Sequence, residues 1–216
     1  MTRDDAWSAA DYVVVDVEGS GAQPPQLVEL ALVPVHQGGI RSARTWLVRP
    51  PEPITWQARR VHGISNDDVT DAPRAEEVAE EVLEALGDSI LVGHAVHVDV
   101  AVLSRALPGW AVPDMIDTPR LARRAFDLPS YSLSSLVRHR RLDAGMPPGM
   151  RLHRAGYDAT VTARLFVDLA STMTPGGATR DALLSTGGPA RSPAQPATAH
   201  DADQTIFDLF RPLTAP

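Results

Sequence analysis

The order of hydrophobic and polar residues predicts a three-stranded antiparallel meander near the start of the chain. Apolar residues recur at alternating or consecutive positions over residues 12–19, 26–35 and 41–48. A glycine-containing turn separates the second segment from the third, and a proline-rich stretch at residues 49–54 ends the pattern. Residues 56–65 then lead into a loop, the type of segment that often carries binding residues.

Short apolar runs alternate with helical periodicity from Pro73 onward. Two of these runs predict further strands, at residues 89–93 and 115–117. Hydrophobic residues spaced three and four apart predict helices at residues 73–86, 94–106, 119–125, 132–137 and 153–173. Strands that alternate with helices form a mixed sheet with helical cover, so we expect an α/β fold.

The composition changes sharply near residue 173. Between residues 173 and 203, 21 of 31 residues are Gly, Pro, Ala, Ser or Thr, which provide too little apolar surface to offset the entropy of an ordered chain. We interpret this segment as a flexible linker, because large apolar residues return only after it. The expected organisation is one domain at residues 1–172, a linker at 173–203 and a short C-terminal motif at 204–216.

Composition and charge narrow the chemistry that the domain can perform. The chain of 216 residues contains no cysteine, so any metal site must consist of oxygen and imidazole ligands. Its net charge of −7 disfavours nonspecific coating of nucleic acid, which depends on many contacts between cations and phosphates. No apolar run is long enough to span a bilayer, and the N-terminus lacks a basic segment followed by an apolar one. We therefore expect a cytoplasmic protein without membrane contacts.

Two carboxylates in the first strand are the strongest candidates for a functional site. Asp16 and Glu18 alternate with valines, so both side chains lie on one face of the strand. Ionised carboxylates in a buried strand are costly unless a positive charge meets them, and a divalent cation would do so. The alternative is a strand end that emerges into solvent at the turn of residues 19–21. Asp99 and Asp158 stand in similar settings, and Mg²⁺ and Mn²⁺ prefer such oxygen ligands.

Arginines are concentrated in the region that leads to the last helix. Between residues 114 and 154, eight arginines stand against four aspartates. They could form a face that binds phosphates or a set of ordinary solvated side chains, and the sequence favours neither interpretation.

Five segments occur in the order that is typical of the DEDD superfamily of 3′–5′ exonucleases. These segments are Asp16–Glu18, Val61–Ile64, Gly93–Asp99, Ile116–Thr118 and His153–Ala159. Over residues 11–171 the chain resembles the histidine-containing DEDDh branch, which includes the proofreading subunit of bacterial replicative polymerases, ribonuclease T and oligoribonuclease. Three residues depart from the usual pattern: Gly19 stands in place of a threonine, Ala95 of an asparagine and Val98 of a phenylalanine. All acidic and histidine positions are present, so the departures bear on substrate preference more than on chemistry.

The resemblance implies a fold, a mechanism and a set of site residues. The fold is ribonuclease-H-like, a mixed five-stranded sheet with helices on both faces. Two Mg²⁺ ions, which Mn²⁺ can replace, would be held by Asp16, Glu18, Asp99 and Asp158. His153 would take the proton of the attacking water, and the product would be a nucleoside 5′-monophosphate. The 3′-terminal nucleotide would lie against Gly19, Val61, His62 and Ile64.

The function implied by the resemblance is 3′–5′ degradation of single-stranded DNA ends in proofreading or repair. One alternative is an exoribonuclease that acts on RNA 3′ ends or short oligoribonucleotides. Another is an inactive module that binds nucleic acid, which predicts a missing carboxylate or histidine, and none is missing. The sequence leaves open the oligomeric state and the polymerase, if any, that the chain accompanies.

The C-terminal motif points to a protein partner. Asp208, Leu209 and Phe210 match the short peptide by which bacterial polymerase-associated proteins dock on the sliding clamp, whereas Ile206 and Phe207 do not match it strictly. The alternative, of equal weight, is a hydrophobic segment that folds back onto its own domain. The predicted linker favours docking, because it would let the peptide reach far from the domain.

Overall fold

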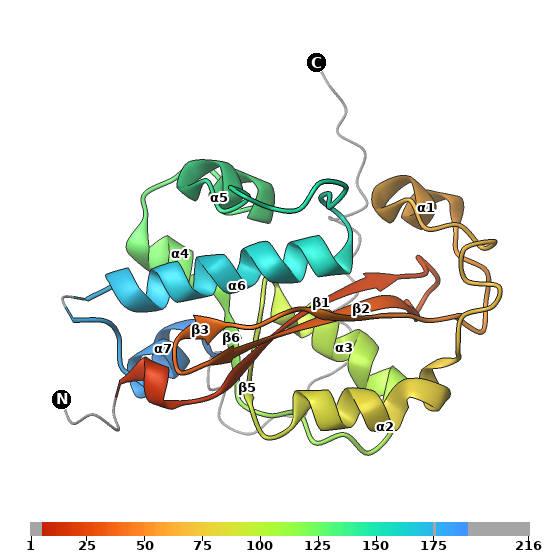
Figure 1. Cartoon of the computed structure of the whole chain (residues 1–216), viewed down its shortest axis with the longest axis horizontal. Coiled ribbons are helices and arrows are strands. Elements are labelled where there is room, and N and C mark those ends of the chain that lie inside the picture. Colours follow the sequence, from red (N-terminus) through yellow and green to blue (C-terminus); the bar gives the residue numbers. More distant parts are fainter. Residues whose placement is uncertain (1–5, 175, 190–216) are drawn as a thin grey trace.

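The computed structural model of the chain describes residues 6–174 and 176–189 (Figure 1). The motif predicted at residues 204–216 lies outside these described residues, as does the predicted linker from residue 190 onward. None of the described helices combines the length and the hydrophobicity that crossing a membrane requires.

A mixed β-sheet forms the centre of the fold. Its strands, in order across the sheet, are β3 (Gly39–Ile40), β2 (Leu27–His36), β1 (Tyr12–Gly19), β5 (Ile90–Gly93) and β6 (Met115–Asp117), and β4 (Arg44–Leu47) also pairs with β2. β2 is antiparallel to β1, β3 and β4, whereas β5 is parallel to β1 and β6. β3 and β4 pair with different parts of β2, so the strands fill five positions across the sheet. The predicted fold class is confirmed, with two short strands in place of the one expected at residues 41–48.

The unequal lengths of β1 and β5 determine where a site can form. β1 pairs with β5 only from Tyr12 to Val14, although it continues to Gly19 beside β2. Backbone N–H groups on the remaining edge of β1 therefore need partners other than a strand. The C-terminal half of β1, which carries Asp16 and Glu18, is open to the elements that follow β5 in the chain.

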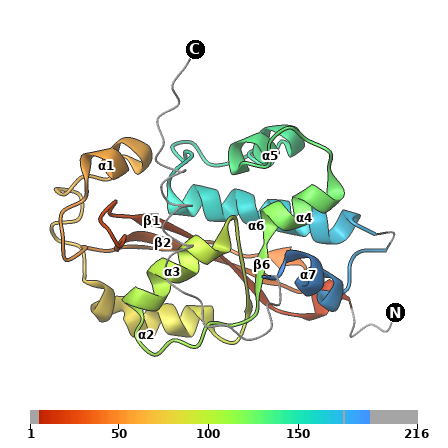
Figure 2. The ribbon, with the colours of Figure 1, turned by 180° about the vertical axis from the view of Figure 1, so that it is seen from behind.

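Helices cover both faces of the sheet (Figures 1 and 2). They are α1 (Trp56–His62), α2 (Ala75–Leu86), α3 (Val96–Ala106), α4 (Thr118–Ala125), α5 (Leu133–Arg140), α6 (Ala155–Thr172) and α7 (Arg180–Gly187), and a 3₁₀ turn, η2, spans Trp7–Ala9. Alternate residues of β1 point to opposite faces: Tyr12 and Val14 join a core with α6, and Val13 and Val15 join a core with α2 and α3. Burial of each such side chain contributes roughly 1.5–3 kcal/mol to stability.

α6 brings the last predicted carboxylate to β1. Its apolar residues Val161, Leu165, Phe166 and Leu169 recur at helical spacing and are fully buried against the sheet, as the sequence predicted. The N-terminal end of α6 lies over the C-terminal half of β1 (Figure 1). The first turn of this helix carries Asp158.

α1 lies where the sequence predicted a loop. Thr55 caps this helix, because its side chain accepts a hydrogen bond from the backbone N–H of Ala58 at 3.3 Å. Gly63 ends it in a left-handed conformation with a φ of 74°, which glycine adopts without strain. The segment Val61–Ile64 thus forms the end of a helix.

α7 lies inside the segment predicted to be a flexible linker. Leu183 of this helix is fully buried in the core that α6 shares with the sheet. The backbone N–H of Trp7 donates a hydrogen bond of 3.2 Å to the carbonyl of Ala178, which ties the segment to the N-terminal 3₁₀ turn. The prediction of a flexible linker is therefore wrong for residues 176–189, because one well-placed leucine anchors a segment that is otherwise poor in large apolar groups.

Candidate active site

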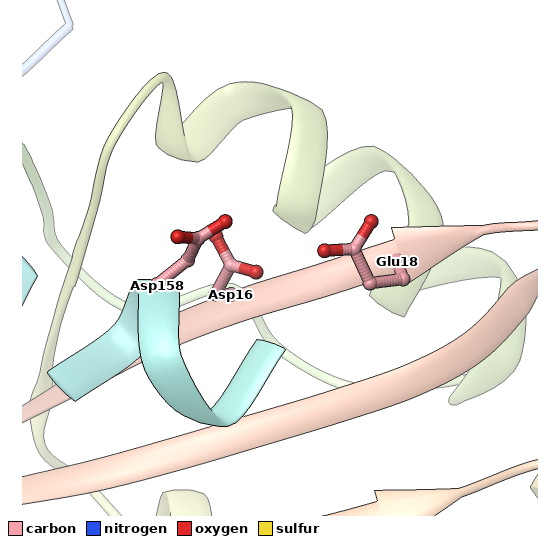
Figure 3. A group of neighbouring side chains, drawn as sticks. All are labelled: Asp16, Glu18 and Asp158. Carbon is pink, nitrogen blue, oxygen red and sulfur yellow. The ribbon is translucent and has the colours of Figure 1, made fainter. Parts of the chain in front are cut away.

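Two carboxylates of β1 and one of α6 converge at the open end of the sheet. Figure 3 shows Asp16, Glu18 and Asp158 together, and one carboxylate oxygen of each lies within 4.8 Å of those of the other two. Asp16 and Glu18 share the face of β1 that α6 covers, because side chains alternate along a strand. We call these three residues the carboxylate cluster. The structure thus brings together three of the four carboxylates that the sequence singled out.

Burial dominates the electrostatics of the carboxylate cluster. Loss of solvent raises the pKa of Asp16 well above its ordinary value, and the charges of Asp99 and Asp158 raise it further. Burial is also the main cause that raises the pKa of Glu18 to about 8 and the pKa of Asp158 to about 7. Without a bound cation, the cluster therefore retains protons close to neutral pH.

One oxygen of Asp158 is suited to bind a cation. Its Oδ2 accepts a hydrogen bond of 3.0 Å from the backbone N–H of His153, whereas its buried Oδ1 has no hydrogen-bond partner among the described residues. A buried polar atom without a partner costs about 1–3 kcal/mol, and more when it is charged. Carboxylate oxygens are the ligands that Mg²⁺ and Mn²⁺ prefer. The residues present therefore fit a hard divalent cation.

Asp99 lies beside the cluster and ties α3 to β1. Its Oδ1 accepts a hydrogen bond of 3.0 Å from the backbone N–H of Val17, on the part of β1 that β5 does not pair. Asp99 is 6% exposed, and burial raises its pKa well above the ordinary value. Although Asp99 is outside the group of three converging carboxylates, its charge raises the pKa of Asp16. The four predicted carboxylates therefore form one electrostatic unit.

His153 lies just before α6 and its side chain faces solvent. Its φ of 61° is left-handed, a conformation that histidine and asparagine adopt more readily than most residues. The residue is exposed, and its ring makes no hydrogen bond with any residue that the structure describes. Partial desolvation lowers the pKa of His153 from its ordinary value, so the ring is neutral near pH 7 and can accept a proton.

Comparison with known proteins identifies the family. Residues 13–166, which include all four carboxylates, match the family model described as exonuclease. The chain belongs to this exonuclease family. The exonuclease is 36% identical to exodeoxyribonuclease 10 of Escherichia coli K12 over 159 residues, which are 74% of this chain and 68% of that protein. It is 31% identical to DNA polymerase III subunit epsilon of Aquifex aeolicus over 165 residues, which are 73% of this chain and 79% of that protein.

A solved structure agrees with the sequence relatives. Exonuclease X in complex with 5′ overhanging duplex DNA matches the exonuclease with a TM-score of 0.65 and 31% identity, over 81% of this chain and 98% of that one. The predicted resemblance to DEDD-superfamily enzymes and the predicted enzyme class, a 3′–5′ exonuclease, are thereby confirmed.

Asp117 holds the start of α3 in place. Its Oδ1 accepts hydrogen bonds from the backbone N–H groups of Ala95 at 2.7 Å and Val96 at 3.2 Å. The positive end of the helix dipole also stabilises a carboxylate at this position. Glycine is required at position 93, since a Cβ there would lie 2.9 Å from the side chain of Val96. Asp117 thus orients the turn of α3 that carries Asp99 in the exonuclease.

Glu29 and Arg154 form an ion pair next to the cluster that sequence reasoning missed. Glu29 is 6% exposed and lies opposite Glu18 in the pairing of β1 with β2. Arg154 donates to both carboxylate oxygens of Glu29, through Nε to Oε2 at 3.0 Å and through Nη2 to Oε1 at 2.5 Å. The backbone N–H of Ala155 donates to Oε2 at 2.9 Å. Glu29 therefore fixes the first turn of α6 and, through it, Asp158; a carboxylate inside an apolar strand was the available signal.

Replacing Glu29 by glutamine should lower kcat and the affinity for divalent cations about tenfold, the usual size of effect for a group that orients metal ligands. Glutamine keeps the size of the side chain but loses the charge that holds Arg154 and the first turn of α6. Steady-state kinetics and a Mg²⁺ titration measure the effect. Glu81→Gln is the matched control, because it removes an exposed ion pair with Arg44. Equal kcat and cation affinity in wild type and Glu29→Gln would contradict the positioning role.

The residues predicted to contact the 3′-terminal nucleotide differ in exposure. Gly19 ends β1 where the pairing with β2 is irregular, and Val61 is half-buried in the last turn of α1. His62 and Ile64 are 1% and 3% exposed, and His62 Nδ1 accepts a hydrogen bond from the backbone N–H of Ile64 at 3.0 Å. The last two side chains are thus buried, and contact of any of the four residues with substrate stays a prediction.

The raised pKa values predict that the metal-free exonuclease loses stability as the pH rises. Unfolded carboxyl groups titrate near about pH 4, whereas the pKa of Asp158 is about 7 and that of Glu18 about 8 in the folded protein. Between these limits the folded state binds more protons than the unfolded state, so the free energy of unfolding falls with rising pH. We expect the melting temperature in EDTA to drop by roughly 5–10 °C from about pH 5.5 to about pH 8.

Calorimetry across this pH range, with and without Mg²⁺, checks the expectation. Excess Mg²⁺ should restore most of the melting temperature at the alkaline end, because a cation offsets the repulsion among the carboxylates. Asp16→Asn removes one of the repelling charges and should give a shallower dependence in EDTA. The same slope in wild type and variant would show that the cluster does not cause the pH effect.

Proposed function

We propose that the exonuclease uses divalent cations to remove nucleotides from the 3′ ends of single-stranded DNA, in proofreading or repair. One observation carries this proposal: a cluster of three carboxylates, in which Asp16 and Glu18 are half-buried and Asp158 is buried with an unpartnered oxygen, lies next to His153, whose side chain is exposed. DNA is favoured over RNA because the relatives include an exodeoxyribonuclease and a subunit of a DNA polymerase.

The proposed cofactors are two Mg²⁺ ions, for which Mn²⁺ can substitute. Asp16, Glu18 and Asp158 offer converging oxygens, and Asp99 adds a fourth carboxylate to the same electrostatic unit. When bound, such cations neutralise the phosphodiester and stabilise the charge that develops during its cleavage. Four neighbouring carboxylates favour a total positive charge of this size, since desolvation raises the pKa of each when no cation is present.

His153 is the proposed general base. Attack of water on the terminal phosphodiester releases a proton and breaks the P–O3′ bond, which leaves a 3′-hydroxyl on the shortened strand and a nucleoside 5′-monophosphate. The neutral, exposed imidazole of His153 suits the removal of this proton. Because Asp158 accepts a hydrogen bond from the backbone N–H of His153, the position of the base is coupled to the carboxylate cluster.

The proposed action on chain ends follows from the elements that border the cluster. α1 is linked to the end of β1 through the backbone N–H of Thr55, which donates to the Ser20 carbonyl at 2.8 Å. On its other side, Arg151 Nη2 donates to the carbonyl of His62 at 3.2 Å and so ties α1 to the loop that carries His153. In this position α1 would block the path of a continuous strand and leave room for a terminal nucleotide against Gly19 and Val61.

Degradation of 5′-labelled single-stranded DNA and RNA of identical sequence tests the proposed function. We expect DNA to shorten from its 3′ end, to release nucleoside 5′-monophosphates, and to require Mg²⁺ or Mn²⁺ in reactions that EDTA stops. Faster degradation of RNA would favour the exoribonuclease alternative. Binding of either strand without any degradation would favour the inactive module. Asp16→Asn serves as the matched control for contaminating nucleases.

The C-terminal motif, which lies outside the described residues, is proposed to dock on a sliding clamp. This proposal rests on the match of Asp208, Leu209 and Phe210 to the clamp-binding peptide, and on the apolar anchors that dominate such interfaces. Fluorescence anisotropy of a labelled peptide of residues 204–216 with a bacterial clamp tests it. Equal affinity of the Leu209→Ala/Phe210→Ala peptide, or no binding at high micromolar clamp, would refute docking and leave the nuclease assignment unaffected.

A further inference from the structure

The arginines near the last helix differ in the contacts that their side chains make. One group is engaged within the domain, with carboxylates, an aromatic ring or a backbone carbonyl, and comprises Arg123, Arg140, Arg151 and Arg154. Arg138 and Arg141, by contrast, are exposed, and their side chains make no hydrogen bond or ion pair with any residue in the described part of the chain. Their charges are therefore available to a ligand.

Arg138 and Arg141 line one hollow of about 460 Å³. The remaining lining residues are Ser134, Val137, Asp143, Leu152 and Tyr157. Ser134, Arg138 and Arg141 follow one another at intervals of four and three residues, so they share a face of α5 and its C-terminal cap. Leu152, in the loop before α6, and Tyr157, in the first turn of α6, also line the hollow.

Two residues that line the hollow are direct sequence neighbours of active-site residues. Tyr157 immediately precedes Asp158 in the first turn of α6, and Leu152 immediately precedes His153. α5 lies alongside α6 on the face of the sheet that carries the cluster (Figure 1). A strand whose 3′ end lies at the cluster must leave across a neighbouring surface, and this surface is positively charged where the cluster is negative.

We propose that this hollow binds a backbone phosphate of the substrate strand, upstream of the 3′-terminal nucleotide; the proposal rests on the proposed nuclease function. Guanidinium groups bind phosphate oxygens through paired hydrogen bonds, and the hydroxyl of Ser134 adds a donor. The ring of Tyr157 and the side chain of Leu152 offer apolar surface to a sugar or base. With Asp143 included, the lining carries two positive charges and one negative charge. This balance matches a singly charged phosphodiester.

A length comparison tests the proposal with the double variant Arg138→Gln/Arg141→Gln. The kcat/KM for a twelve-nucleotide oligothymidylate, divided by that for the dinucleotide dTdT, is measured in Mg²⁺. Loss of an upstream phosphate contact should lower this ratio about tenfold, because the dinucleotide has no upstream phosphate to lose. The dependence of log kcat/KM on log salt for the long substrate should become shallower by about 0.7, the value for one phosphate contact on a single strand.

Arg41→Gln/Arg124→Gln is the control, since both arginines are exposed, the change in net charge is the same, and Arg41 follows β3 at the end of the sheet away from the cluster. It should leave the ratio as in wild type. An unchanged ratio in Arg138→Gln/Arg141→Gln would overturn the proposal. Equal losses on both substrates with a lowered melting temperature would also overturn it, because they indicate a structural role. Wild type without activity on either substrate would refute the proposed function, and this proposal with it.

Discussion

Replacing Asp16 by asparagine should abolish nucleotide release while the metal-free protein stays folded and melts at a higher temperature. Burial and the charges of neighbouring carboxylates raise the pKa of Asp16 well above its ordinary value, so its ionised form is unfavourable without a cation. Asparagine has nearly the same shape and no charge, which relieves this repulsion. The same change removes an anionic ligand, so we expect a loss in kcat of roughly 10³-fold or more, about 4 kcal/mol of transition-state stabilisation.

Nucleotide release in Mg²⁺ and in Mn²⁺, together with a thermal melt in EDTA, measures both parts of this expectation. Glu18→Gln, Asp99→Asn and Asp158→Asn extend it to the other proposed ligands, and Asp71→Asn is an exposed control that lies outside the cluster. Loss of activity together with loss of folding would mean that the carboxylate is structural. Near-normal turnover in any of the four variants would remove that residue from the proposed ligand set.

The carboxylate cluster could be predicted because its geometry follows from local rules. Alternation along a strand is enough to place Asp16 and Glu18 on one face, and the helical period after residue 153 is enough to place Asp158 in a first turn. The supporting contacts depend instead on how distant segments pair. Val17 meets Asp99 only because β1 extends beyond β5, and Glu29 meets Arg154 across 125 residues of chain. A carboxylate inside an apolar strand marks Glu29, but nothing local in the sequence names the partner in either contact.

The error at α7 has a similar cause. Averaged over the predicted linker, the composition is poor in large apolar residues, and such an average predicts disorder. Tertiary packing nevertheless orders α7. Leu183 fills a position in the core, and Gly187 packs so closely on Ile116 that an added Cβ would lie 2.7 Å from it. Burial of single residues depends on the tertiary fold and cannot be read from composition.

The departure from the family pattern at position 95 has a structural consequence. Ala95 caps α3 with a φ of 66° and a ψ of 46°, a left-handed conformation that asparagine tolerates better than alanine. Alanine there costs roughly 1–2 kcal/mol in backbone strain. The departure therefore affects how firmly the start of α3 is held, while the hydrogen bond from the Ala95 N–H to Asp117 is retained. The acidic residues of the site are unchanged by it.

Replacing His153 by asparagine should lower kcat by about 10²–10⁴ and leave KM for single-stranded DNA nearly unchanged, because a general base acts on the chemical step. Asparagine is the sharper substitution than alanine at this position. It tolerates the left-handed backbone that His153 adopts, and so it preserves the geometry in which the backbone N–H of residue 153 donates to Asp158 Oδ2 at 3.0 Å. His153→Ala, in contrast, adds backbone strain to the loss of the base. Comparing kcat of the two variants therefore separates the effect of backbone strain from the effect of losing the base.

The pH dependence of kcat distinguishes the base from a merely structural histidine. Desolvation lowers the pKa of His153, so wild-type kcat should fall only as the pH drops below the ordinary range of histidine, where the protonated ring can no longer accept a proton. His153→Asn should lose this acid limb. Because the ring stands exposed, added imidazole should reach the vacant position and restore part of the activity. An unaltered kcat in His153→Asn, a loss confined to KM, or an acid limb that persists in the variant at saturating Mg²⁺ would refute the assignment of His153 as the base.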